Sequence, residues 1–309
     1  MVEWQIYTSE LFHPNFQLSP FNLELYWLDI RIITLELNGN YHKSLEYCHQ
    51  GREYFEQHPQ KTHSIPGIFL IRELNCYLHL KNYPKGLKKS GQIRRYLPRN
   101  TQNRLVGYQY VMLFYLHRMK AGEALKAYQE IAEELHDNAA LSRINWEKIL
   151  LIRGYLGWLI RSTLNREARV ATANEKALME TCEHDKIKYG FPGISQDKTG
   201  HNIAIQVLEF LELYEAGKND LLLNHSGKWH VYAHRYLKER PVTERSYLFF
   251  YIIETLIRKG FTKEAFTQTR PSIQKIRNAR FRFFDPEEFQ EVIPFEDIWE
   301  HLKVRCLED

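Results

Sequence analysis

Leu37-Asn38-Gly39-Asn40-Tyr41, followed shortly by Ser44, is the stretch of sequence that best indicates the fold of this chain. An apolar helix is expected before this stretch, and the small residue Ser44 opens a more polar helix after it. The same order recurs at Leu80-Lys81-Asn82-Tyr83 before Gly86, at Met119-Lys120 before Ala124, and at Lys259-Gly260-Phe261-Thr262 before Ala265. A recurring pattern of this kind predicts a stack of helical hairpins, an architecture that commonly holds other molecules.

The small residue after each turn serves as a marker for the length of the predicted repeat. Four markers are clear and two, Ala168 and Leu222, are weaker, and consecutive markers are 38 to 54 residues apart. Each interval is long enough for two helices and two turns. The longest interval contains a segment rich in Gly and Pro, residues 185–201, which we expect to be an inserted loop. The markers are Ser44, Gly86, Ala124, Ala168, Leu222 and Ala265.

The two helices of each predicted hairpin differ in polarity. First helices such as Ile149 to Ile160 are apolar nearly all round, so they must be covered on several sides. Second helices such as Tyr41 to Gln57, Pro84 to Leu97 and Glu123 to Leu135 carry one apolar stripe, as expected for an outer layer. Strand-like alternation is nearly absent. We therefore predict an all-α protein with an N-terminal lead-in at 1–20, a helical repeat array at 21–284 and a C-terminal capping helix or tail at 285–309.

These features resemble a degenerate tetratricopeptide repeat (TPR) array, although the units are longer than the roughly 34 residues of that family. In the best unit, from Glu24 to Pro59, the family's turn glycine, turn aromatic, small packing residues and closing proline correspond to Gly39, Tyr41, Ser44, Cys48, Gly51 and Pro59. The resemblance implies a right-handed α-solenoid of about six antiparallel hairpins, with ligands bound in a concave groove lined by the first helices. The alternative is that the polar residues at those positions only solvate the helix edges. The groove positions that the resemblance implies are Arg72, Asn75, His79, Gln109, Tyr110, His117, Arg153 and Arg161.

Positive charge is concentrated in one part of the chain. Residues 81–120 contain ten Lys and Arg and no acidic residue, although the net charge of the whole chain is only +4. A basic patch at helical spacing could neutralise several phosphates of a nucleic acid. We favour a solvated outer face that is balanced by acidic residues of neighbouring units or that meets an acidic protein. The basic patch consists of Lys81, Lys85, Lys88, Arg95 and Arg99.

Sequence patterns typical of catalytic or metal sites are weak. The four cysteines form no Cys-x-x-Cys pair, and neither Cys182-Glu183-His184-Asp185 nor His230 with His234 comes with further ligands at a known metal-site spacing. The segment from Gly193 to Thr199 resembles a phosphate-binding loop, but Asp197 occupies the place of a glycine that must lie against phosphate. We therefore expect no metal, no cofactor and no enzymatic activity, with an activity centred on loop 185–201 as the minor alternative.

The densest apolar run, Leu248 to Ile257, spans ten residues, about half of what a bilayer crossing needs. Met1 to Gln5 lacks the pattern of a secretory signal, and the dispersed cysteines suggest reduced thiols, so we expect a cytoplasmic protein without a membrane partner. The sequence predicts a non-enzymatic scaffold or adaptor that binds a protein or peptide in a concave groove. The alternative is a nucleic-acid-binding helical repeat protein that uses region 81–120.

Overall fold

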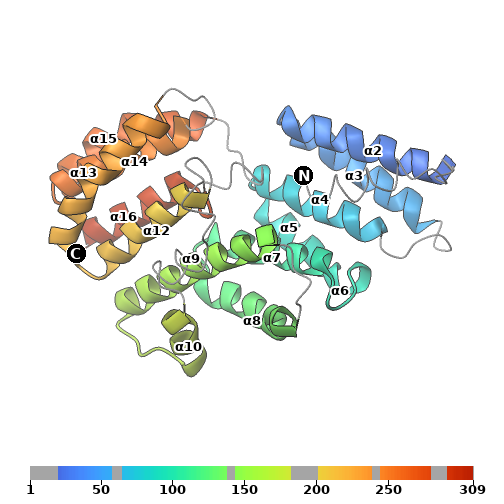
Figure 1. The fold of residues 1–309 in the computed structure, drawn as a ribbon, viewed down its shortest axis with the longest axis horizontal. Coiled ribbons are helices and arrows are strands. Elements are labelled where there is room, and N and C mark those ends of the chain that lie inside the picture. Colours follow the sequence, from blue (N-terminus) through green and yellow to red (C-terminus); the bar gives the residue numbers. More distant parts are fainter. Residues whose placement is uncertain are drawn as a thin grey trace.

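The described part of the chain is all-helical. The computed structural model describes residues 20–57, 65–137, 143–181, 201–238, 244–279 and 291–308, and these residues form 14 helices and no strand (Figure 1). The helices are α2 (Pro20–Leu37), α3 (Tyr41–Glu56), α4 (Ile65–His79), α5 (Tyr83–Ser90), α6 (Ile93–Tyr96), α7 (Gln102–Leu116), α8 (Ala121–Asp137), α9 (Arg143–Glu167), α10 (Ala173–Thr181), α12 (His201–Glu215), α13 (Asn219–Tyr236), α14 (Glu244–Arg258), α15 (Lys263–Asn278) and α16 (Phe295–Glu308).

Six helix ends share one turn geometry. After α2, the amide of Gly39 donates to the carbonyl of Glu36 and the amide of Asn40 donates to that of Leu35, both at 2.8 Å. This pair of bonds is a Schellman motif, in which the residue just past the helix adopts a positive φ and the last carbonyls of the helix are satisfied. The same two bonds recur after α4, α7, α9, α12 and α14. The residue that carries the positive φ just past each helix is Gly39 (71°), Lys81 (52°), Met119 (53°), Ala168 (48°), Gly217 (64°) or Gly260 (66°), and Phe261, which follows Gly260, also has a positive φ (58°).

The marker residues are buried at close helix contacts, with one exception. Ser44, Ala124 and Ala265 are 0% exposed, and a Cβ on Gly86 would lie only 2.4 Å from the ring of Phe114. The exception is the fourth marker, because Ala168 is an exposed residue of the turn itself.

The fourth turn is longer than the others, which explains why its marker is wrong. Helix α10 begins only at Ala173, five residues after Ala168. Thr172, just before the helix, and Glu175, in its first turn, form a reciprocal capping box. The Glu175 carboxylate accepts from the Thr172 amide at 2.8 Å, and the Thr172 hydroxyl accepts from the Glu175 amide at 3.3 Å. The marker should therefore have been placed several residues later in the chain.

Helices that follow one another in the chain pack together. The second helix of a hairpin contacts the first helix of the next one, as α3 does with α4, α5 with α7, α8 with α9 and α13 with α14. The first helices α4, α7, α9 and α12 also contact one another in that order and form a continuous row (Figure 1). This packing explains why the first helices are apolar nearly all round.

The segment from Pro84 to Leu97 differs from expectation because it forms two helices. Helix α5 ends at Ser90 and α6 begins at Ile93, with Gly91 at the end of α5. Glycine loses more backbone freedom in a helix than any other residue, so a helix breaks easily there. The break lets Leu97 lie against α4 at Gly67, where an added Cβ would be 2.4 Å from the Leu97 side chain.

The C-terminal helix α16 covers several elements. Phe295, Ile298 and Leu302 are at most 1% exposed, and α16 packs along α15. Contacts with α9 and α12 show that this helix also lies against the row of first helices, since the His301 ring meets the Trp158 ring at 5.4 Å and the Tyr214 hydroxyl lies 2.9 Å from the Cys306 sulfur. None of the described helices is both long and apolar enough to span a bilayer.

Candidate binding surfaces

The predicted groove residues on α4 are largely engaged within the N-terminal hairpins. Arg72 lies 3.4 Å from Asp29 and 3.3 Å from Glu36 of α2, and burial raises the pKa of Glu36 although Arg72 opposes the effect. The ring of His79 stacks on Tyr41 of α3 with 4.0 Å between ring centroids. Asn75 is 7% exposed. Of the three predicted groove residues on this helix, only Arg72 and His79 therefore offer partly exposed surface.

The predicted groove residues at α7 are buried. Gln109 is 0% exposed and donates its side-chain amide to the Asn145 carbonyl at 3.3 Å, and Tyr110 is 4% exposed. His117 follows the last residue of α7, and its Nε2 lies 3.2 Å from the carbonyl oxygen of Val292. Burial, aided by the charge of Lys81, lowers the pKa of His117 to about 3, so its imidazole is neutral at physiological pH.

The predicted groove residues on α9 keep partial exposure. Arg161 forms an ion pair with Glu212 of α12 at 2.6 Å. Arg153, which lies nearer the start of α9, is half-buried. The eight predicted groove residues thus divide into four buried ones and four that present part of their surface. The four with accessible surface are Arg72, His79, Arg153 and Arg161.

The chain's own C-terminal segment lies against part of the predicted groove. Its Val292 carbonyl meets His117, its Glu296 forms a 2.6 Å ion pair with Lys81, and its His301 lies 2.8 Å from the hydroxyl of Ser162 on α9. These pairs join residues 139 to 215 positions apart. The acidic composition of 285–300 was the available sequence signal, but it could not indicate that Lys81 was a partner.

A buried ionic cluster fixes the start of that segment to α14. Arg245, 6% exposed, donates to Glu291 at 2.6 and 2.8 Å and to Glu296 at 2.7 Å, and it also donates to the carbonyl of Ile276. Burial raises the pKa of Glu291, although the positive charge of Arg245 opposes this effect. At Glu296, burial also favours the neutral form, but Arg245 and Lys81 outweigh it and lower the pKa. This cluster was not anticipated from the sequence.

The predicted basic patch is partly neutralised. Lys81 is paired with Glu296, whereas Lys85, Lys88 and Arg95 are exposed and form no ion pair within the described ranges. Arg95 lies over the ring of Tyr96, 5.0 Å from its centroid, and Arg99 is exposed beyond α6. Because α5 and α6 are separate helices, these residues do not share one continuous helical stripe.

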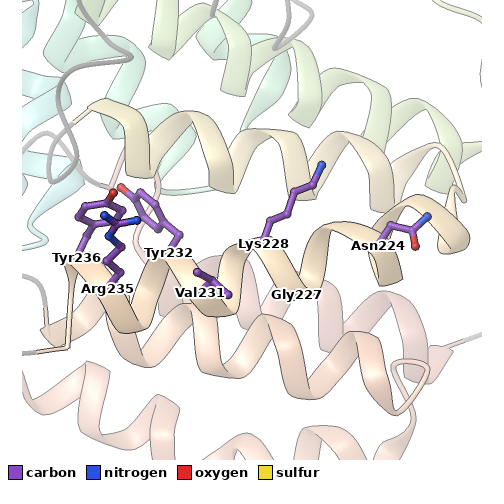
Figure 2. A pocket seen from close by; sticks show the side chains of 7 residues that line it. All are labelled: Asn224, Gly227, Lys228, Val231, Tyr232, Arg235 and Tyr236. Atoms are coloured by element: carbon purple, nitrogen blue, oxygen red, sulfur yellow. The ribbon is translucent and has the colours of Figure 1, made fainter.

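A hollow of about 570 Å³ lies along α13 (Figure 2). Its floor includes Gly227, where an added Cβ would meet nothing within 4 Å, and Val231, which is 61% exposed. Tyr232 and Tyr236 form its aromatic end, with 5.4 Å between their ring centroids. Figure 2 shows the side chains of this hollow on one side of a single helix. The lining residues are Asn224, Gly227, Lys228, Val231, Tyr232, Arg235 and Tyr236.

Lys228 and Arg235 make the hollow positively charged. Both are exposed, and neither forms an ion pair with any residue that the structure describes. Arg235 lies over the Tyr236 ring at 5.3 Å from the centroid. This surface was not anticipated from the sequence, where its only local signal was Gly227 in the middle of a helical stretch.

The two histidines singled out in the sequence lie at the contact between α13 and α14. His230 Nδ1 lies 2.7 Å from Glu254, which also pairs with Arg258, and the His230 and His234 rings are 4.8 Å apart. Among the residues with described positions, no group of three His, Cys, Asp or Glu side chains is arranged to hold a metal. Cys182-Glu183-His184-Asp185 and the segment from Gly193 to Thr199 lie outside the described residues.

Comparison of the chain with protein-family models, curated proteins and solved structures gave no match. The resemblance to the TPR family therefore stays a prediction that rests on the residues quoted for it. Assignment of function rests on the surfaces described above.

Proposed function

We propose that this chain is a non-enzymatic helical-repeat scaffold, a right-handed α-solenoid of about six hairpins, that binds a protein or peptide. The six equivalent Schellman turns support the repeat, because the same backbone bonds recur where each new second helix begins. In four of the hairpins, the second helix contacts the first helix of the next hairpin, and these contacts support the stacking. Repeats that contact only their neighbours build long surfaces, and binding of other molecules is the usual role of such surfaces.

The observation that carries the binding proposal is the hollow on α13. It combines two tyrosines with two cations that have no acidic partner in the described residues. Tyrosine and arginine are enriched among the residues that contribute most to protein interfaces, whereas a lysine at the edge favours an acidic partner. An acidic segment with an apolar side chain could pair with Lys228 and Arg235 while covering Val231.

The groove lined by first helices is the second part of this proposal. Arg72, His79, Arg153 and Arg161 supply its accessible positive or polar surface. Arg72 and Arg161 already pair with acids, so we expect them to contribute less than the cations of the hollow on α13.

Site-directed photocrosslinking tests the binding proposal. A photoreactive amino acid at position 231, within the hollow, should yield a protein adduct in nuclease-treated extract of the source cells. The same group at Val170, an 82% exposed residue between α9 and α10, is the matched control. The Lys228→Glu/Arg235→Glu variant should weaken the adduct, whereas Lys126→Glu/Lys176→Glu, at two exposed positions elsewhere, should leave it unchanged. Equal adducts at 231 and 170, or adducts insensitive to both charge reversals, would contradict the proposal.

Nucleic-acid binding is the second candidate, supported by Lys85, Lys88 and Arg95, which are exposed and form no ion pair with a described residue. Binding to a mixed RNA and DNA pool at low salt should be measured for the parent and for a variant with Lys85, Lys88, Arg95 and Arg99 all changed to Glu. Micromolar binding that falls log-linearly with salt and disappears in the variant would place nucleic acid first. Weak binding that is equal in both would remove this candidate.

A further inference from the structure

The solvent-facing side of α2 is apolar. Leu23 is 50% exposed, Trp27 45%, Ile30 54% and Leu37 67%, so this one helix carries four of the twelve large hydrophobic residues that are exposed in the described structure. Its opposite side already packs inward through Leu28 and Ile32. A helix that is apolar on both sides requires cover on both. In Figure 1, α2 lies at the edge of the molecule, where such cover can come from outside.

The spacing of these side chains suits pairing with another helix. Leu23, Trp27 and Ile30 are separated by four and then three residues, and Thr34 and Leu37 continue the same alternation. Alternating steps of four and three place all five positions on one seam with the period of 3.5 residues that lets two helices interdigitate. The seam runs along most of an 18-residue helix, which is about 27 Å long.

Trp27 is held in position before any partner binds. The guanidinium of Arg31 lies 4.0 Å from the centre of the Trp27 ring, and the rings of Trp27 and Tyr47 are nearly perpendicular with 6.1 Å between their centroids. Arg31 is fixed in turn by donating to the Tyr47 hydroxyl at 2.7 Å. An exposed tryptophan with little remaining freedom loses little entropy on binding, so it is suited to be an anchor of an interface.

The charges beside the seam are self-complementary. Glu24 and Arg31 lie on the same flank of the seam, seven residues apart, whereas the other flank carries the uncharged residues Tyr26 and Ile33. When two copies of α2 cross in antiparallel orientation about a two-fold axis, Glu24 of each copy approaches Arg31 of the other. A two-fold interface requires such self-complementarity, because the same patch serves on both sides.

We propose that α2 is a dimerisation helix that pairs in antiparallel orientation with α2 of a second copy of this chain. The interface has four large hydrophobic side chains from each copy, each about half exposed in the single chain. The surface that one helix of this length can bury against its copy lies near the lower limit for specific protein interfaces. The dimer is therefore expected to dissociate at roughly micromolar concentration.

Sedimentation velocity of the full chain tests this proposal across roughly two decades of concentration around 10 µM. The wild type should shift from a 37.1 kDa monomer to a dimer within that range. Ile30→Glu should remain monomeric, and Glu24→Arg, which places two like charges opposite each other, should raise the dissociation constant about tenfold. Leu223→Glu on α13, at a residue that is 52% exposed, is the matched control and should dimerise like the wild type. Circular dichroism should show unchanged helix content in all variants.

Three results would overturn the proposal. A wild type that stays monomeric at the highest concentration excludes a second copy as the partner. A monomeric wild type that dimerises once residues 1–19 are removed would assign the face to the chain's own N-terminal segment. Ile30→Glu that dimerises as tightly as Leu223→Glu would place the dimer interface elsewhere.

Discussion

Replacing Arg245 with Met should destabilise the protein by about 3–5 kcal/mol at neutral pH. Arg245 makes three charge-assisted hydrogen bonds of 2.6 to 2.8 Å to Glu291 and Glu296, and both carboxylate residues are 4% exposed. Met fills a similar volume but leaves two buried negative charges without their main partner, a loss that costs far more than the net contribution of the ion pairs. For a chain of this length the shift in melting temperature should be about 5–8 °C.

The pH dependence of this loss identifies its cause. Without Arg245, the pKa of both carboxyl groups should rise relative to the wild type, because burial favours their neutral forms and Arg245 opposes that effect. A group whose folded pKa is raised favours folding at low pH, and that contribution is lost as the pH rises through the folded pKa. The difference between wild type and Arg245→Met should therefore be smaller at about pH 5 than at about pH 7.5.

Urea unfolding followed by circular dichroism at both pH values measures these differences. Arg258→Met is the matched control, because Arg258 pairs with Glu254 at 2.7 Å but its side chain is 63% exposed, and its loss should cost less than about 1 kcal/mol. Arg245→Lys keeps the charge but loses the forked geometry, so it should fall between the two. A cost for Arg245→Met no larger than that of Arg258→Met, or one that does not change with pH, would show that the buried carboxylates do not depend on Arg245.

Three further predictions concern stability. His117→Gln should flatten the pH dependence of the free energy of unfolding. The pKa of the buried imidazole is lowered to about 3, so in the wild type only the unfolded chain takes up a proton as the pH falls through about 6.5, and stability drops by about 1.4 kcal/mol between pH 7.5 and 5.5. Equal slopes of stability against pH for wild type and variant in urea titrations would contradict this. Gly86→Ala should destabilise the protein by about 1–3 kcal/mol, because the added Cβ would meet the Phe114 ring at 2.4 Å. Gly227→Ala, at an open site in the middle of a helix, should instead stabilise it by about 0.5–1 kcal/mol. Calorimetry that shows a change of the same sign for both variants would be inconsistent with the packing. Ala124→Leu should cost about 1–3 kcal/mol by overpacking a fully buried helix contact, and an unchanged melting temperature would remove Ala124 from that contact.

The helical class and most hairpin turns could be predicted from the sequence because their causes are local. Gly39 and Gly260 have the positive φ that glycine tolerates, and the small residues Ser44, Gly86 and Ala124 are buried where their markers placed them. Lys81 and Met119 adopt the same positive φ without being glycine, so those turns were recognisable only by analogy with the glycine-containing ones. The fourth marker was wrong because Ala168 also adopts a positive φ without being glycine. In sequence it resembles a small packing residue, but it lies within a turn.

The candidate site was less predictable, because helical periodicity shows which face of a helix is polar but not what covers that face. Gln109 and His117 were expected to line a groove, yet one is buried against the backbone of Asn145 and the other against that of Val292. The hollow on α13 had almost no sequence signal, since its openness depends on which neighbouring helices do not reach Gly227.

Local sequence was sufficient to predict the helical class, the position of most hairpin turns, and which residues after those turns are small enough for close contact. These features depend on backbone hydrogen bonds and steric limits within about six residues of the chain. The partners of Lys81, His117 and Arg245 in the C-terminal segment emerged only from the packed helices, since Glu296, Val292 and Glu291 lie 46 to 215 positions further along the chain. A buried charge or imidazole is satisfied by whichever group the packing brings within about 3 Å, and separation along the chain does not limit that choice.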